Sequence, residues 1–185
     1  MRHGFVKVAA ATPDIRVADV AYNTQKICGL IDETVKEGAK VVAFPELCVT
    51  GYTCGDLFTQ EVLLKEARAA LHKIARHTKG KDALIFVGVP VAVEGKLYNV
   101  AAALNQGKIL GLTTKSFLPN YGEFYEMRQF TEGPSAAREI LFDGEKMPFG
   151  PQLLFVADSM ESLVVSAEIC EDAWSSVPPS IEAAR

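Results

Sequence analysis

The sequence contains no apolar run long enough to cross a membrane. A spanning helix needs about 20 consecutive, mostly apolar residues, and charged residues interrupt every apolar stretch of this 185-residue chain well before that length. The first residues also lead directly into a strand-like stretch, without the apolar segment of a secretory signal peptide. We therefore expect a cytoplasmic protein that does not bind a membrane.

An excess of basic charge is also absent. The chain has 19 Lys and Arg against 23 Asp and Glu, a net charge of -4. Proteins that bind nucleic acid neutralise phosphates with clustered Lys and Arg. This mild negative charge argues against nucleic acid, and against an anionic membrane surface, as the main partner.

Cysteines are few and scattered. The four cysteines, at positions 28, 48, 54 and 170, include no CxxC pair. Disulfide frameworks and cysteine-based metal sites show closely patterned cysteines, and disulfides are rare in the cytoplasm. We therefore expect free thiols and no metal site.

The overall composition is that of a globular protein. Hydrophobic residues make up 49% and charged residues 23% of the chain, close to the averages for globular domains. No internal repeat, low-complexity tract or linker interrupts it. We therefore predict one domain over residues 1–185.

The first part of the chain alternates between strands and helices. We predict strands over 5–11 and 41–44, each stopped by a proline. Apolar residues at helical spacing predict a helix over 16–37 and a second helix over 60–78, with Thr59 as its N-cap.

The middle of the chain predicts an antiparallel meander. Three apolar runs, 83–91, 97–104 and 109–113, are separated by short turns that contain glycine. Residues 115–150 are rich in Pro and Gly and predict loops. Two more strands, over 152–157 and 163–169, and a helix beginning near Pro178 follow. Because many strands are apolar on both faces, we expect two packed sheets with helices outside.

Three polar residues stand where an apolar element ends. Glu46 follows the strand over 41–44, Lys115 follows the meander, and Cys170 follows the last predicted strand. Catalytic groups often gather at strand ends. Each residue also has a structural interpretation, since single cysteines are commonly buried as small hydrophobic residues and acidic or basic residues are commonly solvated.

The chemistry of these three residues is coherent. A free thiol titrates near pH ~8.5, so it needs a base to become a nucleophile at neutral pH. A carboxylate can take the thiol proton, and an ammonium can stabilise negative charge. The three histidines are weaker candidates for the base: His3 is close to the N-terminus, and His72 and His77 lie among basic residues of the second predicted helix.

The surrounding motifs resemble those of the nitrilase, or carbon–nitrogen hydrolase, superfamily. Phe44-Pro45-Glu46, Thr114-Lys115 and Glu168-Ile169-Cys170-Glu171-Asp172 match its three signature segments in order. The stretch over 115–130, together with 46–52 and 170–174, is similar to the glutaminase domains of glutamine-dependent NAD synthetases. The resemblance covers nearly the whole chain.

This resemblance implies a nitrilase-like αββα sandwich of the α/β class. It also implies an activity, the hydrolysis of glutamine to glutamate, with ammonia passed to a synthetase domain. By resemblance, Cys170 is the nucleophile, Glu46 the general base and Lys115 the electrostatic partner. ATP with Mg, and the NAD precursor, would bind only to the synthetase domain, and no cofactor is implied for the domain described by this sequence.

The resemblance also points to three further residues. Tyr121 and Glu171 would contact substrate, the latter through its backbone N–H in the oxyanion site. Tyr121 could equally be a loop tyrosine that packs its ring. Glu126 would orient Lys115, although a salt bridge with Arg128 or Arg138 is an equal alternative.

The sequence departs from this family in two respects. The glutaminase domain of the family continues beyond the length of this chain, so we expect a C-terminally incomplete sandwich. No glycine-rich pyrophosphate loop is present, so we expect residues 1–185 to lack the synthetase domain. Two alternatives stay open, a stand-alone nitrilase-type amidase or carbamoyl hydrolase and an inactive fragment with a structural or interaction role. The family resemblance further implies homo-oligomers.

Overall fold

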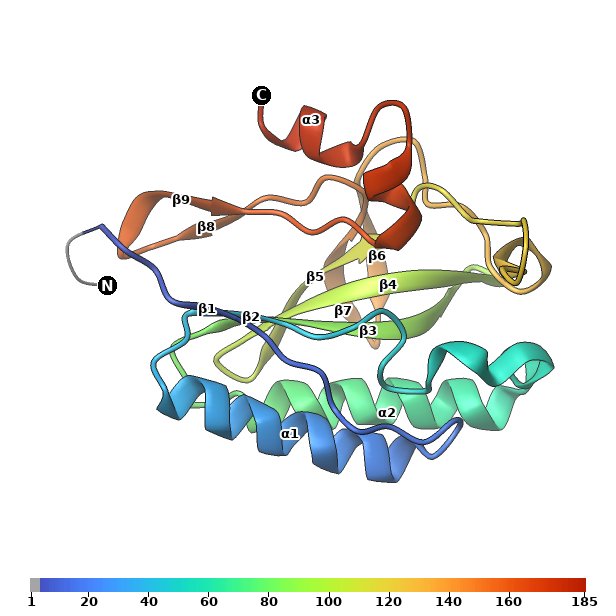
Figure 1. Cartoon of the computed structure of the whole chain (residues 1–185), viewed down its shortest axis with the longest axis horizontal. Coiled ribbons are helices and arrows are strands. Elements are labelled where there is room, and N and C mark those ends of the chain that lie inside the picture. Colours follow the sequence, from blue (N-terminus) through green and yellow to red (C-terminus); the bar gives the residue numbers. More distant parts are fainter. Residues whose placement is uncertain (1–3) are drawn as a thin grey trace.

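The computed structural model describes residues 4–185. Its elements form layers, which Figure 1 shows edge-on. Two long helices lie under a twisted sheet, a two-stranded hairpin lies over the opposite face of that sheet, and a short C-terminal helix lies above the hairpin. This succession of helix, sheet, sheet and helix agrees with the predicted αββα class.

Within residues 4–185, the main sheet has seven strands in the order β1-β2-β3-β4-β5-β7-β6. The pairs β1–β2, β2–β3 and β5–β7 are parallel, and the pairs β3–β4, β4–β5 and β6–β7 are antiparallel. The bounds of the strands are Val8–Ala10, Val41–Ala43, Leu84–Val93, Lys96–Asn105, Lys108–Thr114, Arg138–Phe142 and Glu145–Gly150 for β1 to β7.

Two amphipathic helices cover one face of this sheet. Helix α1 (Val20–Lys36) begins after Asp19, whose side chain accepts the N–H of Tyr22. Helix α2 (Glu61–His77) follows the 3₁₀ segment η1 (Tyr52–Thr59). Each helix buries residues spaced three or four apart, as one core-facing stripe requires. Those residues are Val20, Asn23, Thr24, Ile27 and Ile31 in α1 and Leu63, Ala67, Ala70, Leu71, Ile74 and Ala75 in α2.

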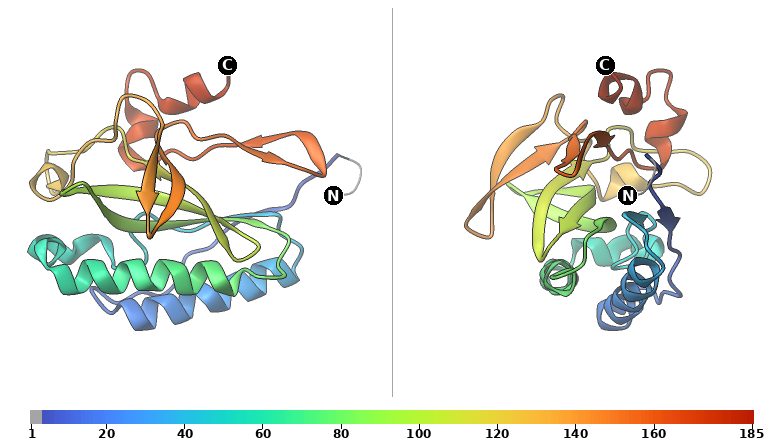
Figure 2. Two further views of the ribbon diagram at one scale, coloured as in Figure 1. Left: turned by 180° about the vertical axis from the view of Figure 1, so that it is seen from behind. Right: turned by 90° about the vertical axis from the view of Figure 1, so that its left-hand side faces the viewer.

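The opposite face of the sheet carries the second layer. Strands β8 (Phe155–Ala157) and β9 (Met160–Val165) form an antiparallel hairpin, and the chain then runs back over the sheet into the 3₁₀ turn η3 (Cys170–Trp174) and helix α3 (Pro179–Ala183). The two turned views in Figure 2 show this layer apart from the helices. The long loop over 115–137, which contains η2 (Glu126–Arg128), connects β5 to β6.

The structure confirms the predicted meander and corrects several element ends. Strands β3, β4 and β5 are antiparallel neighbours, as the short glycine turns indicate. Thr59 is not the cap of α2, because its hydroxyl donates to the carbonyl of Asp56 and Gln60 occupies the cap position. The region over 138–150 is not a loop but the β6–β7 hairpin. No helix of the described residues is long and apolar enough to cross a membrane.

Candidate active site

Glu46 lies in a tight turn that follows β2. The next residue, Leu47, has a φ of 51°, in the left-handed region that non-glycine residues rarely adopt. Gly88 of β3 lies beneath this turn, and a Cβ atom there would collide with the backbone at Pro45, Glu46 and Leu47. Backbone packing on a glycine therefore determines how closely Glu46 approaches the sheet.

Lys115 directly follows β5 and has a fully buried side chain. Its Nζ lies 2.7 Å from Oε1 of Glu46 and 2.7 Å from Oε1 of Glu126. Burial by itself lowers the pKa of the Lys115 ammonium, but the two adjacent carboxylates outweigh this effect and raise the pKa above its ordinary value. Lys115 is therefore a cation at neutral pH.

Glu126, at the start of η2, contacts the buried ammonium directly, and only 4% of its side chain is exposed. The alternative of an arginine salt bridge is wrong. Arg128 pairs instead with Asp56, and Arg138 pairs with Glu94. The structure thus places Glu126 where the resemblance implies, next to the lysine.

Two neutral hydrogen-bond donors complete the cluster formed by Glu46, Lys115 and Glu126. The sequence analysis missed both donors. The Tyr52 hydroxyl donates to Oε1 of Glu126 over 2.7 Å. Asn99 of β4 donates through Nδ2 to Oε1 of Glu46 over 2.6 Å, and to Oε2 of Glu126 over 3.4 Å. One signal was available for Asn99, since it is a polar residue within an apolar strand and must therefore find a partner.

Cys170 begins η3 and is exposed. Its φ of 49° is again left-handed, a conformation that costs energy for a non-glycine residue and often marks functional turns. Partial burial raises the pKa of the Cys170 thiol, and the charge of Glu46 raises it further, while Lys115 opposes this in part. The resting group is therefore a protonated thiol close to a carboxylate, which can act as its base.

Asp172 connects the cysteine turn to the lysine strand, and the sequence analysis did not identify this role. Its Oδ1 accepts the backbone N–H groups of Ser116 and Phe117, each over 2.9 Å, and its Oδ2 accepts that of Ile169 over 3.1 Å. Burial raises the pKa of Asp172, and these three N–H groups oppose that rise. One buried carboxylate therefore fixes the position of η3 relative to the end of β5.

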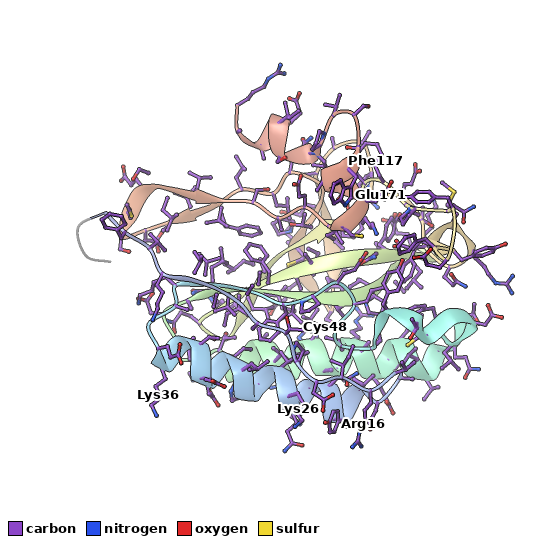
Figure 3. The ribbon with its side chains drawn as sticks, viewed as in Figure 1. Arg16, Lys26, Lys36, Cys48, Phe117 and Glu171 are labelled. Carbon is purple, nitrogen blue, oxygen red and sulfur yellow. The ribbon has the colours of Figure 1, made fainter. Side chains whose placement is uncertain are left out.

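Tyr121 and Glu171 lie together at the rim of the site. The Tyr121 hydroxyl donates to Oε2 of Glu171 over 2.8 Å, and the tyrosine ring also packs edge-on against Phe124. Tyr121 is 60% exposed. Figure 3 shows Glu171 above the sheet. Both residues are thus near Cys170, and the packing interpretation of Tyr121 also holds.

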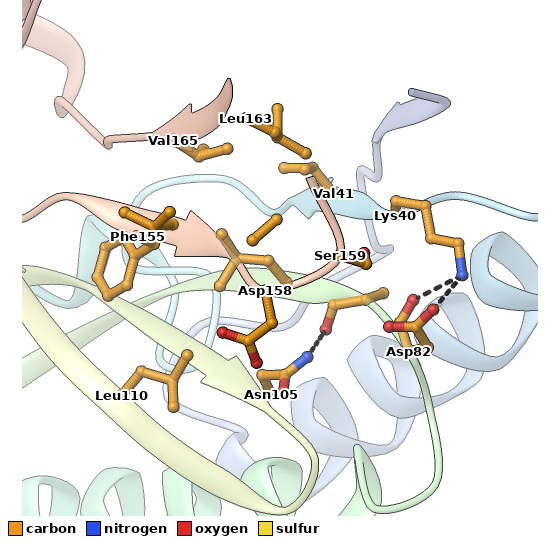
Figure 4. A pocket seen from close by; sticks show the side chains of 14 residues that line it. Lys40, Val41, Asp82, Asn105, Leu110, Phe155, Asp158, Ser159, Leu163 and Val165 are labelled. Atoms are coloured by element: carbon orange, nitrogen blue, oxygen red, sulfur yellow. Dashed lines mark hydrogen bonds and ion pairs between the residues drawn. The ribbon is translucent and has the colours of Figure 1, made fainter. Parts of the chain in front are cut away.

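A cleft of about 310 Å³ extends between the sheet and the segment that leads into η3. Glu46 and Cys170 both line it, and Phe44, Phe86 and Val100 contribute apolar surface. The volume is at the lower end of the range for small-molecule sites. A separate cleft of about 480 Å³, shown in Figure 4, lies between the sheet and the β8–β9 hairpin, and none of the predicted site residues lines it.

The other cysteines do not share this environment. Cys48 is fully buried, lies between the sheet and the helices (Figure 3), and burial raises its pKa to about 12. His72 and His77 lie on α2, on the opposite side of the sheet from η3. They pair with Asp143, in the turn between β6 and β7, and with Asp32 of α1. His3 lies outside the described residues. Among the described residues, no group of three or more His, Cys, Asp or Glu could hold a metal ion.

The fold and the sequence motifs together identify the protein family of this chain. The family model for carbon–nitrogen hydrolases matches residues 7–180, and the chain belongs to that family. An amidase from Nesterenkonia, 22% identical with a TM-score of 0.58 over 80% of this chain and 56% of its own, shares the fold.

Three other proteins have a higher sequence identity to this chain than the amidase has. A glutamine-dependent NAD(+) synthetase of Mycobacterium tuberculosis is 36% identical over 99% of this chain and 27% of its own length, and that of Aquifex aeolicus is 36% identical over 91% of this chain and 26% of its own. The crystal structure of a glutamine-dependent NAD(+) synthetase from Cytophaga hutchinsonii superposes with a TM-score of 0.82 at 29% identity, over 90% of this chain and 28% of that chain. This chain therefore spans about a quarter of the length of these relatives.

Proposed function

We propose that this chain carries the glutamine-hydrolysing site of a glutamine-dependent NAD synthetase. The observation that carries the proposal is the cluster in which Lys115 bridges Glu46 and Glu126, with Cys170 close to Glu46. The similarity to several NAD synthetases over almost the entire chain supports glutamine as the amide.

The reaction would begin with the protonated thiol. Glu46 takes the proton of Cys170, and the sulfur forms a bond to the side-chain carbonyl carbon of glutamine. The carbonyl oxygen becomes an oxyanion, which the Lys115 ammonium and the backbone N–H of Glu171 would stabilise. The first N–H groups of a helix have no partner within it, so the Glu171 N–H is suited to this role.

The second half of the reaction regenerates the enzyme. Glu46 returns the proton to the amide nitrogen, the C–N bond breaks, and ammonia leaves a thioester on Cys170. A water molecule then gives a proton to Glu46 and attacks the thioester carbon. The C–S bond breaks, glutamate leaves, and the sulfur recovers its proton from Glu46. Lys115 and Glu126 keep their charges throughout.

The ammonia would be consumed in a separate synthetase domain, which we propose as the functional partner. ATP with Mg and the NAD precursor would bind there, and no cofactor takes part in the steps above. We further propose a cytoplasmic location, from the scattered free cysteines, and a homo-oligomeric assembly, from the family resemblance.

Covalent labelling tests the proposal on this chain. The diazoketone analogue of glutamine, 6-diazo-5-oxo-L-norleucine, should alkylate Cys170 and increase the mass of the peptide that contains it. Glu46→Gln should abolish labelling, and Cys28→Ser, at a half-buried cysteine outside the site, should leave it unchanged. Labelling of Cys170 that is independent of Glu46 would contradict the proposed base.

Turnover assays separate the alternatives left open by the sequence. Ammonia release from glutamine is compared with release from a panel of small aliphatic amides and carbamoyl compounds. Preference for a compound without α-amino and α-carboxylate groups would favour a stand-alone amidase. Absence of both labelling and turnover in a folded chain, checked by circular dichroism, would favour a structural role.

A further inference from the structure

The side chain of Asn99 bridges the two carboxylates of the site. It is 1% exposed and projects from β4 opposite Lys115, whose backbone N–H donates to the Asn99 carbonyl over 2.9 Å. Its Nδ2 lies 2.6 Å from Oε1 of Glu46 and 3.4 Å from Oε2 of Glu126. Both the backbone and the side chain of Asn99 therefore contact the cluster.

The orientation of this amide is determined by its surroundings. An ionised carboxylate can only accept hydrogen bonds, so the NH₂ group of Asn99, and not its oxygen, must face Glu46 and Glu126. The Asn99 oxygen is consequently left buried, without a hydrogen-bond partner among the described residues. A buried polar atom without a partner costs free energy, and the contacts to the two carboxylates oppose that cost.

The hydrogen bonds also distinguish the two oxygens of Glu46. Lys115 and Asn99 both donate to Oε1, over 2.7 and 2.6 Å. We infer that Asn99 is a positioning residue, which together with Lys115 holds Oε1 of Glu46 so that Oε2 is directed to the Cys170 thiol as the proton acceptor. This inference rests on the proposed role of Glu46 as the base.

The charges around Glu46 give this contact a measurable consequence. Among residues 4–185, Lys115 is the one cation paired with Glu46. The nearby groups Glu126, the Cys170 thiol and the Tyr52 phenol carry negative charge when ionised. A neutral donor at position 99 adds a hydrogen bond without adding charge. A carboxylate there would add negative charge beside Glu46 and close to the Cys170 thiol, which disfavours the thiolate.

The pH dependence of Cys170 alkylation tests the inference. The chain is treated with iodoacetamide over a range of about pH 6 to 10, and the rate at Cys170 is measured by peptide mass spectrometry. Asn99→Asp, which keeps the shape of the side chain, should move the profile to higher pH. Each unit of displacement lowers the neutral-pH rate about tenfold. Asn99→Leu, which removes the donor without adding charge, should move it in the same direction by less.

Asn105→Asp is the matched control. Asn105 lies at the other end of β4 and donates to the backbone carbonyl of Ala83 over 2.9 Å, away from the site (Figure 4). This variant should keep the wild-type profile. Folding of each variant is checked by circular dichroism, and Asn99→Leu carries the test if Asn99→Asp does not fold.

The outcomes distinguish the inference from the function on which it rests. Asn99 variants that lower the melting temperature but keep the wild-type pH profile would overturn the inference and leave Asn99 a structural residue. If Glu46→Gln also leaves the profile unchanged, the proposed base fails as well. Displacement of the profile by Glu46→Gln and by both Asn99 variants, but not by Asn105→Asp, is the expected result.

Discussion

The site consists of two halves that differ in burial and in support. The acid–base half, Glu46, Lys115 and Glu126, lies against the long central strands, and its side chains are 16%, 0% and 4% exposed. The nucleophile half, residues 166–174, lies in the second layer on a short 3₁₀ turn, and Cys170 is exposed. The charges are therefore held rigidly, whereas the thiol is held mainly by the Asp172 hydrogen bonds.

The largest effect on stability is expected in the acid–base half. Lys115→Met removes the cation between Glu46 and Glu126 and leaves two buried carboxylates side by side. Breaking a buried ion pair on one side costs about 3–5 kcal/mol, which urea unfolding would measure at neutral pH. Lys146→Met is the control, because the Lys146–Glu139 pair is exposed and such pairs contribute about 0–1 kcal/mol. Equal losses of unfolding free energy in the two variants would contradict the conclusion that the buried ion pairs stabilise the acid–base half.

The next effect concerns the packing beneath Glu46. Gly88→Ala places a methyl group against the backbone at Pro45 and Leu47, so the turn must move away from the sheet. We expect a loss of about 1–3 kcal/mol in unfolding free energy together with slower labelling of Cys170. Gly29→Ala, in α1 where a Cβ meets no atom within 4 Å beyond the backbone of its own helix, should be neutral or stabilising. Unchanged labelling in Gly88→Ala would show that this turn tolerates displacement.

An effect on stability of the same order is expected in the nucleophile half. Asp172→Asn keeps an acceptor for some of the three backbone N–H groups but places an NH₂ group against at least one of them. The expected loss is about 1–3 kcal/mol, with a larger relative effect on Cys170 labelling than on unfolding. Asp82→Asn, at an exposed carboxylate paired with Lys40, serves as the control. A variant that loses stability but labels normally would disprove the positioning role of Asp172.

The smallest perturbation is a change of pH alone. Because burial and then the charge of Glu46 raise the pKa of the Cys170 thiol, the protonated form persists to higher pH than in a free cysteine. Alkylation by a small neutral reagent should therefore be slow at neutral pH and increase as the pH rises above the ordinary range of about 8.5. A rate that is already maximal at neutral pH would instead indicate a resting thiolate.

The sequence pointed to the candidate site residues more directly than to the turns that support them. Glu46, Lys115 and Cys170 each end an apolar run, so pattern and chemistry make them candidates, and the family resemblance implies the role of each. Glu126 and Tyr121 required the family resemblance, because their loop has no periodicity. Asp172 belongs to a recognised motif, but its role depends on backbone N–H groups about 55 residues earlier in the chain, and no local pattern encodes such a contact.

The elements of the fold also differ in how well the sequence predicted them. The meander was predictable because strand propensity and glycine turns agree there. The β6–β7 hairpin was missed because Pro148, which normally argues against a strand, lies within β7. Asn99 was missed as a site residue because an isolated polar residue within a strand does not reveal which carboxylate it will meet.

The hydrogen bonds of Asp172 have a consequence for how this protein can change its sequence. Ser116 and Phe117 contribute only backbone N–H groups to the contact, so any residue except proline can occupy these two positions without loss of the connection. Asp172 itself has no such freedom. The side chains at the first two positions can therefore change while the connection between the end of β5 and the cysteine turn is preserved.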